Sequence, residues 1–158
     1  MSIFVKPVAA PKPRTAESRK IATAYAVILV ILAVAQLFTF DTFLDLLVTF
    51  EFAGGRQMAY FLASLLVVSE VFALPFLLRM AVSPLFRWVS MGFALLSPLI
   101  WVKITTWLVI MDVAVTNVGF LGTVVEVMPG WWAVFVSAAL TILAAWTAWG
   151  LWPGKRRK

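Results

Sequence analysis

Two ionisable residues, Glu70 and Lys103, lie inside long apolar stretches of the sequence. An ionised side chain at the centre of a bilayer costs about 2.5 to 3.5 kcal/mol on insertion scales, so each residue needs a compensating partner. The two stretches are expected to run in opposite directions, and because side chains tilt toward the N-terminus of their helix, Glu70 and Lys103 lean toward each other. The sequence therefore allows an intramembrane pair, either as a proton or substrate site or as a structural ion pair.

A second arrangement of the same residues remains open. In it, a neutral Glu70 is hydrogen-bonded to a hydroxyl group, while Lys103 reaches a carboxylate outside the hydrocarbon core. The candidate hydroxyl groups are those of Ser69, Ser97 and Thr105. The candidate carboxylates are those of Asp41, Asp45 and Asp112. The two arrangements differ in whether a cation lies beside the carboxyl group of Glu70.

The residue types that are missing exclude most enzyme classes. The chain contains no Cys and no His, which excludes thiolate nucleophiles, Cys-ligated clusters, imidazole ligands and His-dependent triads. We therefore expect no bound cofactor and no metal site, and a non-catalytic role is favoured over an enzyme.

The composition is that of a membrane protein. The 158 residues are 63% hydrophobic, with a mean hydropathy of +1.01, whereas soluble domains are about 45–50% apolar. Four segments approach the roughly 20 apolar residues that a membrane-crossing helix needs, at residues 21–40, 58–78, 88–111 and 131–152. The sequence predicts an all-α integral membrane protein, a bundle of four transmembrane helices over residues 21–152. A disordered basic tail is expected at residues 1–20 and a second basic tail at 153–158.

The basic residues predict the orientation of the bundle. Eleven of the thirteen lie in the two tails or between the second and third spans, and the positive-inside bias makes that side cytoplasmic. Both termini are then cytoplasmic, in a multi-pass protein of the cytoplasmic membrane. We expect the tails to bind anionic lipid headgroups rather than nucleic acid, because they adjoin the spans and lack interleaved aromatic residues. The start also matches a signal peptide, but we expect it to remain as the first span.

The opposite side of the bundle is acidic. Its carboxylates are those of Asp41, Asp45, Glu51, Asp112 and Glu126. Residues 41–50 place acidic and apolar residues at helical spacing, which predicts a short helix in the membrane interface. Residues 113–130 alternate loosely around Gly and Asn, which indicates a small hairpin or a re-entrant turn.

The fourth span carries a stripe of small residues spaced four, and at its end three, residues apart. The stripe consists of Ala133, Ser137, Thr141, Ala145 and Ala148. Such stripes let helices approach closely, either within the bundle or between chains.

Two prolines and three tryptophans lie deep inside the spans. Pro75 and Pro98 each free a backbone carbonyl, at Val71 and Ala94, and could open a pocket near Glu70 or only shape the packing. A quinone or lipid ring could stack on the deep tryptophans Trp101 and Trp107 beside Glu70, but core packing is the favoured explanation for the deep tryptophans, Trp146 included.

The order of features along residues 19–110 resembles the DoxX and MauE-like superfamily of small four-helix membrane proteins. The features are Arg19 before the first span, an interfacial apolar loop, and the sequence EVFALPFLLR from Glu70 to Arg79. Gln36 stands near the position of the family's lysine on the first span. The resemblance implies that Glu70 is the functional acid and that the role is redox-associated and accessory.

Three functional hypotheses follow from the sequence. The first is an accessory subunit that docks a partner membrane protein, or a second copy of itself, through the small-residue stripe or the acidic loops. The second is a small transporter or proton-coupled carrier that uses Glu70 and Lys103. The third is a quinone- or lipid-binding enzyme subunit, with the ring held between Trp101, Trp107 and Glu70.

Overall fold

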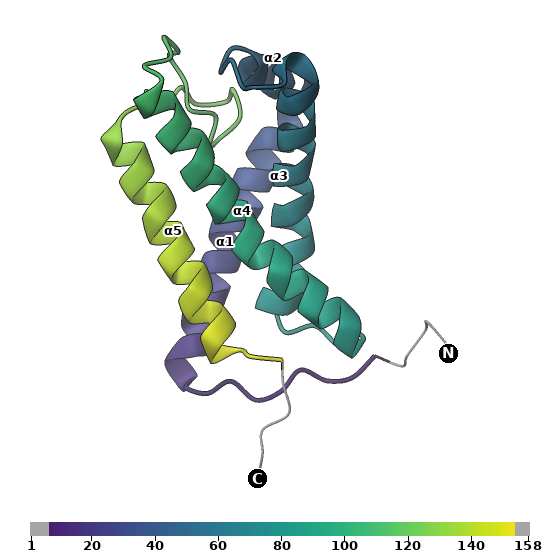
Figure 1. Ribbon diagram of the computed structural model, residues 1–158. Helices are drawn as coiled ribbons and strands as arrows, with labels where there is room; N and C mark the ends of the chain where they lie inside the picture. Colours follow the sequence, from purple (N-terminus) through teal and green to yellow (C-terminus); the bar gives the residue numbers. More distant parts are fainter. Residues whose placement is uncertain (1–6, 154–158) are drawn as a thin grey trace.

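The computed structural model describes residues 7–153, and within them the chain is all-α (Figure 1). The elements are α1 (Ala16–Phe38), α2 (Phe40–Val48), α3 (Gly55–Leu77), α4 (Pro84–Ile110) and α5 (Trp131–Gly150). The four long helices pack side by side and are each long and apolar enough to cross a membrane. The predicted class, a bundle of four candidate transmembrane helices, is confirmed.

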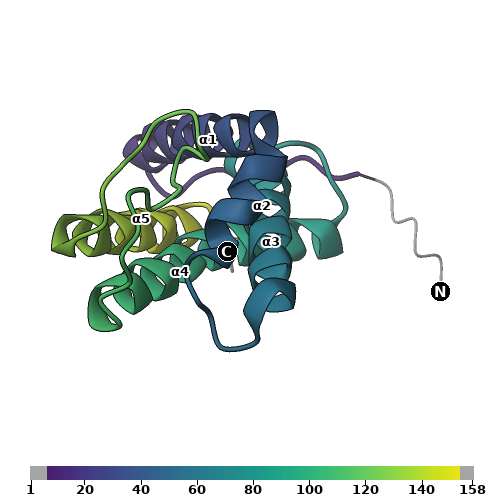
Figure 2. The same cartoon turned by 90° about the horizontal axis from the view of Figure 1, so that it is seen from above.

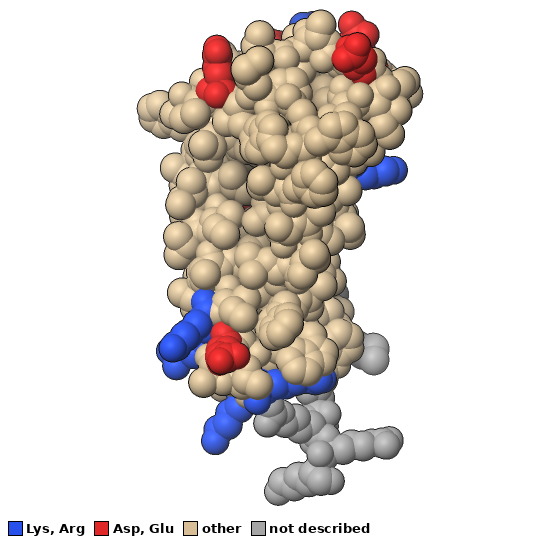
Figure 3. Space-filling model, turned by 90° about the vertical axis from the view of Figure 1, so that its left-hand side faces the viewer, with Lys and Arg blue, Asp and Glu red and all other residues tan. Residues whose placement is uncertain are grey.

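The two ends of the bundle differ in structure. The N-terminal segment enters and α5 ends at one end, which we call the tail end (Figure 1). At the other end, α2 lies across the bundle and the α4–α5 loop covers the space beside it (Figure 2). We call residues 39–54 and 111–130 together the cap. The side view shows a middle zone with few charged side chains, between a tail end rich in Lys and Arg and a cap that carries Asp and Glu (Figure 3).

The outside of the bundle is apolar on every long helix. Large side chains remain exposed there, including those of Ile31, Phe61, Leu99, Phe135 and Ile142. In water, so large an apolar surface would drive association, whereas in a bilayer it contacts lipid chains. The protein is therefore a multi-pass membrane protein.

The first helix begins earlier than the sequence predicted. The Thr15 hydroxyl caps α1 by accepting from the backbone N–H of Ser18 at 3.1 Å, so residues 16–20 are helical and the prediction of a disordered tail over residues 1–20 is wrong there. Residues 7–15 are extended across the tail end. Their backbone is tied to the bundle by a bond from the Arg14 N–H to the Gly150 carbonyl, 2.9 Å, and by the Arg87 guanidinium on the Val8 carbonyl. Residues 1–6 and 154–158 lie outside the described part of the chain.

The short interfacial helix is confirmed as α2. Phe43 and Leu47, four residues apart, are fully buried against the bundle, while Asp41 and Asp45 point outward and are exposed. This is the apolar and polar division that the spacing predicts. The first span ends at Phe38, two residues before the predicted boundary, because the chain turns into α2.

The small-residue stripe of α5 lies largely inside the bundle. Ala133, Ser137 and Ala148 are buried, and the Ser137 hydroxyl is 3.0 Å from the Thr105 hydroxyl on α4. Of the remaining members, Thr141 is half-buried and Ala145 is exposed. Of the two uses that the sequence allowed, the buried members serve packing within the chain.

Side chains from neighbouring helices occupy the backbone positions that two prolines disturb. Pro98 cannot donate to the Ala94 carbonyl, and the Tyr25 hydroxyl on α1 donates to it instead at 2.7 Å. On α3, the Ser90 hydroxyl accepts from the Phe76 N–H at 2.9 Å and donates to the Phe72 carbonyl at 2.6 Å.

An unbroken helix would join Phe76 and Phe72 directly. The Ser90 hydroxyl is therefore inserted into the hydrogen-bond ladder of α3 next to Pro75. Near both Pro75 and Pro98, backbone groups that lack their usual partner in the helix are hydrogen-bonded to a side chain of a neighbouring helix, which holds the two helices together.

Candidate functional site: a carboxyl group buried beneath the cap

Glu70 on α3 is completely buried, with 0% of its surface exposed. Its Oε1 accepts three side-chain hydrogen bonds from two other helices. Trp101 Nε1 donates at 3.2 Å, and Gln36 Nε2 and Ser97 Oγ donate at 3.4 Å. Because Ser97 and Trp101 are four residues apart, they share the face of α4 that meets α3. The site thus joins α1, α3 and α4.

The donors around Glu70 are all neutral. Within residues 7–153, Oε2 of Glu70 and Oε1 of Gln36 are buried and have no hydrogen-bond partner. A carboxyl group in the interior is costly unless it is paired or neutralised. This site holds the carboxyl group with amide, indole and hydroxyl groups and one free oxygen, so it can accept or release a proton without breaking an ion pair.

The structure does not bring Lys103 to Glu70. Lys103 is exposed and lines a groove of about 290 Å³ between α3 and α4, together with Met58 and Trp107. Helical geometry explains the separation: Lys103 follows Trp101 by two residues, a rotation of about 200° around the helix. Trp101 therefore faces Glu70 while Lys103 faces away from it.

Of the three hydroxyl groups considered for Glu70, the structure selects that of Ser97. The Ser69 hydroxyl donates to the Leu66 carbonyl, and the Thr105 hydroxyl donates to the Trp101 carbonyl. Both are one turn back on their own helices. Such back-bonding is the usual arrangement for hydroxyl groups inside membrane helices.

The deep tryptophans do not form a common ring site with Glu70. Trp101 is completely buried and its ring lies 4.7 Å from that of Phe120. Trp107 donates from Nε1 to the Phe50 carbonyl at 2.9 Å and lines the groove that contains Lys103, a groove without Trp101 or Glu70. The expected quinone or lipid site between these three residues is therefore not assembled.

The cap closes the Glu70 site from the outside. Gln36 Nε2, which donates to Glu70, also donates to the Phe120 carbonyl in the α4–α5 loop at 3.1 Å. Phe120 and Val118 of the same loop are buried. The loop is neither a regular hairpin nor an open connection, because its middle part folds down onto the end of the bundle.

One buried amide organises the loop. Oδ1 of Asn117 accepts from the N–H groups of Gly119 and Val127 at 2.9 and 3.1 Å, and its Nδ2 donates to the Gly122 carbonyl at 3.0 Å. Gly122 has a φ of +58°, and a Cβ there would lie 2.4 Å from the Thr39 hydroxyl, so glycine is required. The loop therefore has one closely packed conformation.

The five acidic residues that the sequence placed on the outer side all lie on the cap and are exposed. They are Asp41, Asp45, Glu51, Asp112 and Glu126. The basic residue Arg56 at the start of α3 stacks on the ring of Tyr60 at 5.6 Å. Between residues 7 and 153, none of these carboxylates forms an ion pair or is grouped with others as a metal site. Their charge is therefore directed outward.

Several side chains that hold the site were not singled out from the sequence. Tyr25, Ser90 and Asn117 are buried polar residues, and Gln36 was noted only through a resemblance. The sequence does contain a signal for Tyr25 and Ser90. A proline leaves backbone groups of its helix without hydrogen-bond partners, and a polar residue in an apolar run of a neighbouring helix is expected to bind them.

No family model matches this sequence, and no curated protein or solved structure matches it either. The fold and the site define a class, a four-span all-α membrane protein with a buried carboxyl group. The resemblance to the DoxX and MauE-like proteins stays a prediction.

Proposed function

We propose that the protein is a membrane accessory subunit that binds a partner protein through its cap. The observation that carries this proposal is the folded conformation of the α4–α5 loop. Antiparallel helices are usually joined by about 2 to 8 residues, and long loops without regular structure are typically functional. Here residues 111–130 form such a loop, and Asn117 holds it in one shape.

The chemistry of the cap indicates the kind of partner. Its exposed surface combines the five carboxylates with apolar side chains at Val124, Val125 and Met128, which are 55%, 47% and 72% exposed. Protein interfaces commonly have an apolar centre within a polar rim, and opposite charges direct the encounter. The partner is therefore a protein with a basic surface around an apolar patch. From the DoxX and MauE-like resemblance, we further propose that the partner belongs to a redox system.

The test uses the full chain at native expression level, extracted in mild detergent and analysed by native mass spectrometry. We expect to find a stoichiometric partner whose binding weakens with salt. The amount of bound partner should fall at least about tenfold in the triple variant that combines Asp41→Asn, Asp45→Asn and Glu126→Gln. The matched control is Glu17→Gln, an exposed glutamate in the first turn of α1. Recovery of only lipid and the chain itself, or equal capture by both variants, would count against the proposal.

A second function, a proton-coupled carrier, is favoured by the neutral donors to Glu70, which include no cation within residues 7–153. Ionisable groups inside spans mark proton and substrate pathways, and a neutral donor set lets the proton leave and return. The structure favours Glu70 alone for this role, since Lys103 lies in another groove. The test is proton flux into dye-loaded proteoliposomes under a pH gradient. Glu70→Gln should reduce the flux to that of empty vesicles and Lys103→Gln should leave it unchanged, whereas unchanged flux in the glutamine variant of Glu70 would remove this function.

A further inference from the structure

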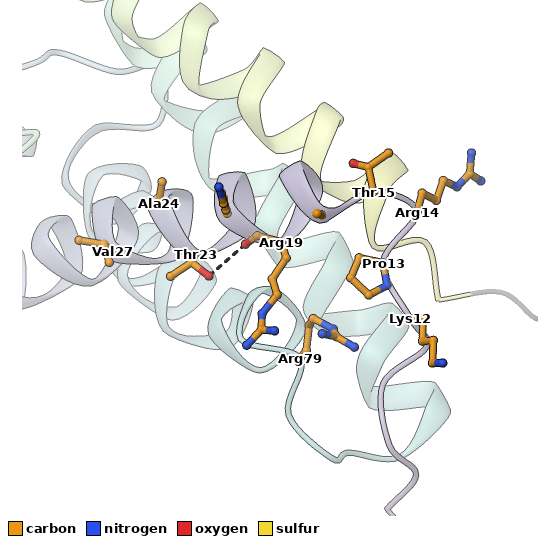
Figure 4. A pocket seen from close by; sticks show the side chains of 11 residues that line it. Lys12, Pro13, Arg14, Thr15, Arg19, Thr23, Ala24, Val27 and Arg79 are labelled. Carbon is orange, nitrogen blue, oxygen red and sulfur yellow. Dashed lines mark hydrogen bonds between the residues drawn. The ribbon is translucent and has the colours of Figure 1, made fainter.

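A basic cavity opens at the tail end of the bundle, remote from the cap. Its volume is about 970 Å³, and it lies between the N-terminal segment, the start of α1 and the end of α3 (Figure 4). Five basic residues line it, namely Lys12, Arg14, Arg19, Lys20 and Arg79. No acidic residue is among its lining residues, so the cavity suits an anion.

Two arginines from different helices converge inside this cavity. Arg19 on α1 and Arg79 just after α3 extend side by side, with Thr23 next to them (Figure 4). These three residues also line an adjoining cavity of about 490 Å³. Arg14 is directed elsewhere, over the ring of Trp149 at 4.8 Å. The pair Arg19 and Arg79 is therefore the centre of the basic surface.

The backbone and the N-terminal segment fix the position of Arg79. Its φ is +57°, a left-handed conformation that turns the chain sharply after α3. One guanidinium nitrogen, Nη2, donates to the Pro11 carbonyl at 3.2 Å. Nε is buried and has no hydrogen-bond partner within residues 7–153. Arg79 nevertheless lines the cavity, so the accessible part of its guanidinium group can donate to an anion there.

One wall of the cavity is apolar and leads along the outside of α1. Ala24 and Val27 line it, and Val27, Val30 and Ile31 are exposed on the helix at 54%, 39% and 53%. A ligand with a charged head and a hydrocarbon chain fits this division, with its head at the arginines and its chain beside Val27. The arginines lie where the spans end, which is the depth of lipid headgroups.

We propose that Arg19 and Arg79 bind the phosphate group of an anionic phospholipid, with an acyl chain packed along α1. Guanidinium groups bind phosphate with paired, geometrically matched hydrogen bonds. Among the described residues no carboxylate lines the cavity, so neither arginine is paired with an acidic side chain there. This site is separate from the cap and does not depend on the function proposed there.

The experiment measures lipid retained by the purified full chain in native mass spectrometry after exchange into vesicles of phosphatidylglycerol or phosphatidylcholine. We expect retention of phosphatidylglycerol to exceed that of phosphatidylcholine. Each of Arg19→Gln and Arg79→Gln should weaken retention about fivefold and the double variant about thirtyfold, from ~1 kcal/mol per basic residue at the surface. Arg56→Gln, at the cap end of α3, is the matched control and should retain lipid as the original chain does.

Three results would overturn the proposal. One is equal retention of the two lipids by the original chain, a comparison that needs no variant to fold. Another is equal loss in the Arg56 control. The third concerns the source of the phosphate. Millimolar inorganic phosphate alone would then displace the lipid, and it would raise the melting temperature of the original chain but not that of Arg19→Gln. In that case the ligand is a soluble phosphate compound. Arg19→Gln leaves the Arg79 to Pro11 bond in place, so it separates loss of binding from loss of fold.

Discussion

Replacing Asn117 by alanine should open the cap while leaving the four spans folded. The amide makes three hydrogen bonds at 2.9 to 3.1 Å, of which those with Gly119 and Gly122 are buried and that with Val127 is partly buried. At about 1 kcal/mol for each bond, their removal destabilises the loop by ~3 kcal/mol. The free energy of local opening of the loop falls by the same amount, so the hydrogen-exchange rate of the loop amides should rise about 150-fold. The increase should be confined to residues 111–130.

Hydrogen-exchange mass spectrometry in detergent or nanodiscs measures this effect directly. The control variant is Thr42→Val, which removes a hydroxyl bond of 2.6 Å to Thr123 at an exposed position of the same cap. Water replaces an exposed bond readily, so the control should change exchange less than about threefold. The reasoning is refuted if the Asn117 variant changes the loop no more than the control does, or if exchange rises equally in the spans.

Three further substitutions test helix packing through the free energy of unfolding, measured by titration with a denaturing detergent. Tyr25→Phe removes the donor to a carbonyl of α4 and should cost about 1 to 2 kcal/mol. Ser90→Ala leaves two buried backbone groups of α3 without a partner and should cost about 1 to 3 kcal/mol. Gly150→Ala would put a Cβ 2.4 Å from the Ser18 hydroxyl and should cost about 1 to 3 kcal/mol. Gly92→Ala has open space around it and is the control, so equal stability of these two alanine variants would contradict the α1–α5 contact.

The sequence predicted the spans because the requirement of a membrane is simple. A helix that crosses hydrocarbon must be long and apolar, and all four predicted segments lie within or close to observed helices. The boundaries differ where local chemistry acts, as at Thr15, whose cap extends α1 backward to Ala16. The short helix α2 was predictable too, since two opposite faces can be recognised in nine residues.

The partners of Glu70 could not be predicted from depth alone. Depth and side-chain tilt permitted an ion pair with Lys103, but the rotation of α4 determines which residues face α3. Inside a bilayer every face of a helix is apolar, so hydrophobic periodicity does not reveal that rotation. Polar residues carry the missing information: Ser97 and Trp101 share one face of α4, and Lys103 lies on another.

The Glu70 site and the cap are coupled through a single side chain. Gln36 donates from the same nitrogen to Glu70 and to the Phe120 carbonyl, and its own oxygen has no partner within the described chain. A displacement of the loop that moves the Phe120 carbonyl therefore acts on the same amide that donates to Glu70. The amide nitrogen carries two N–H groups, so each bond uses its own hydrogen and both can form at once. The docking and carrier functions proposed above would thus meet at Gln36, which contacts both the loop and the buried carboxyl group.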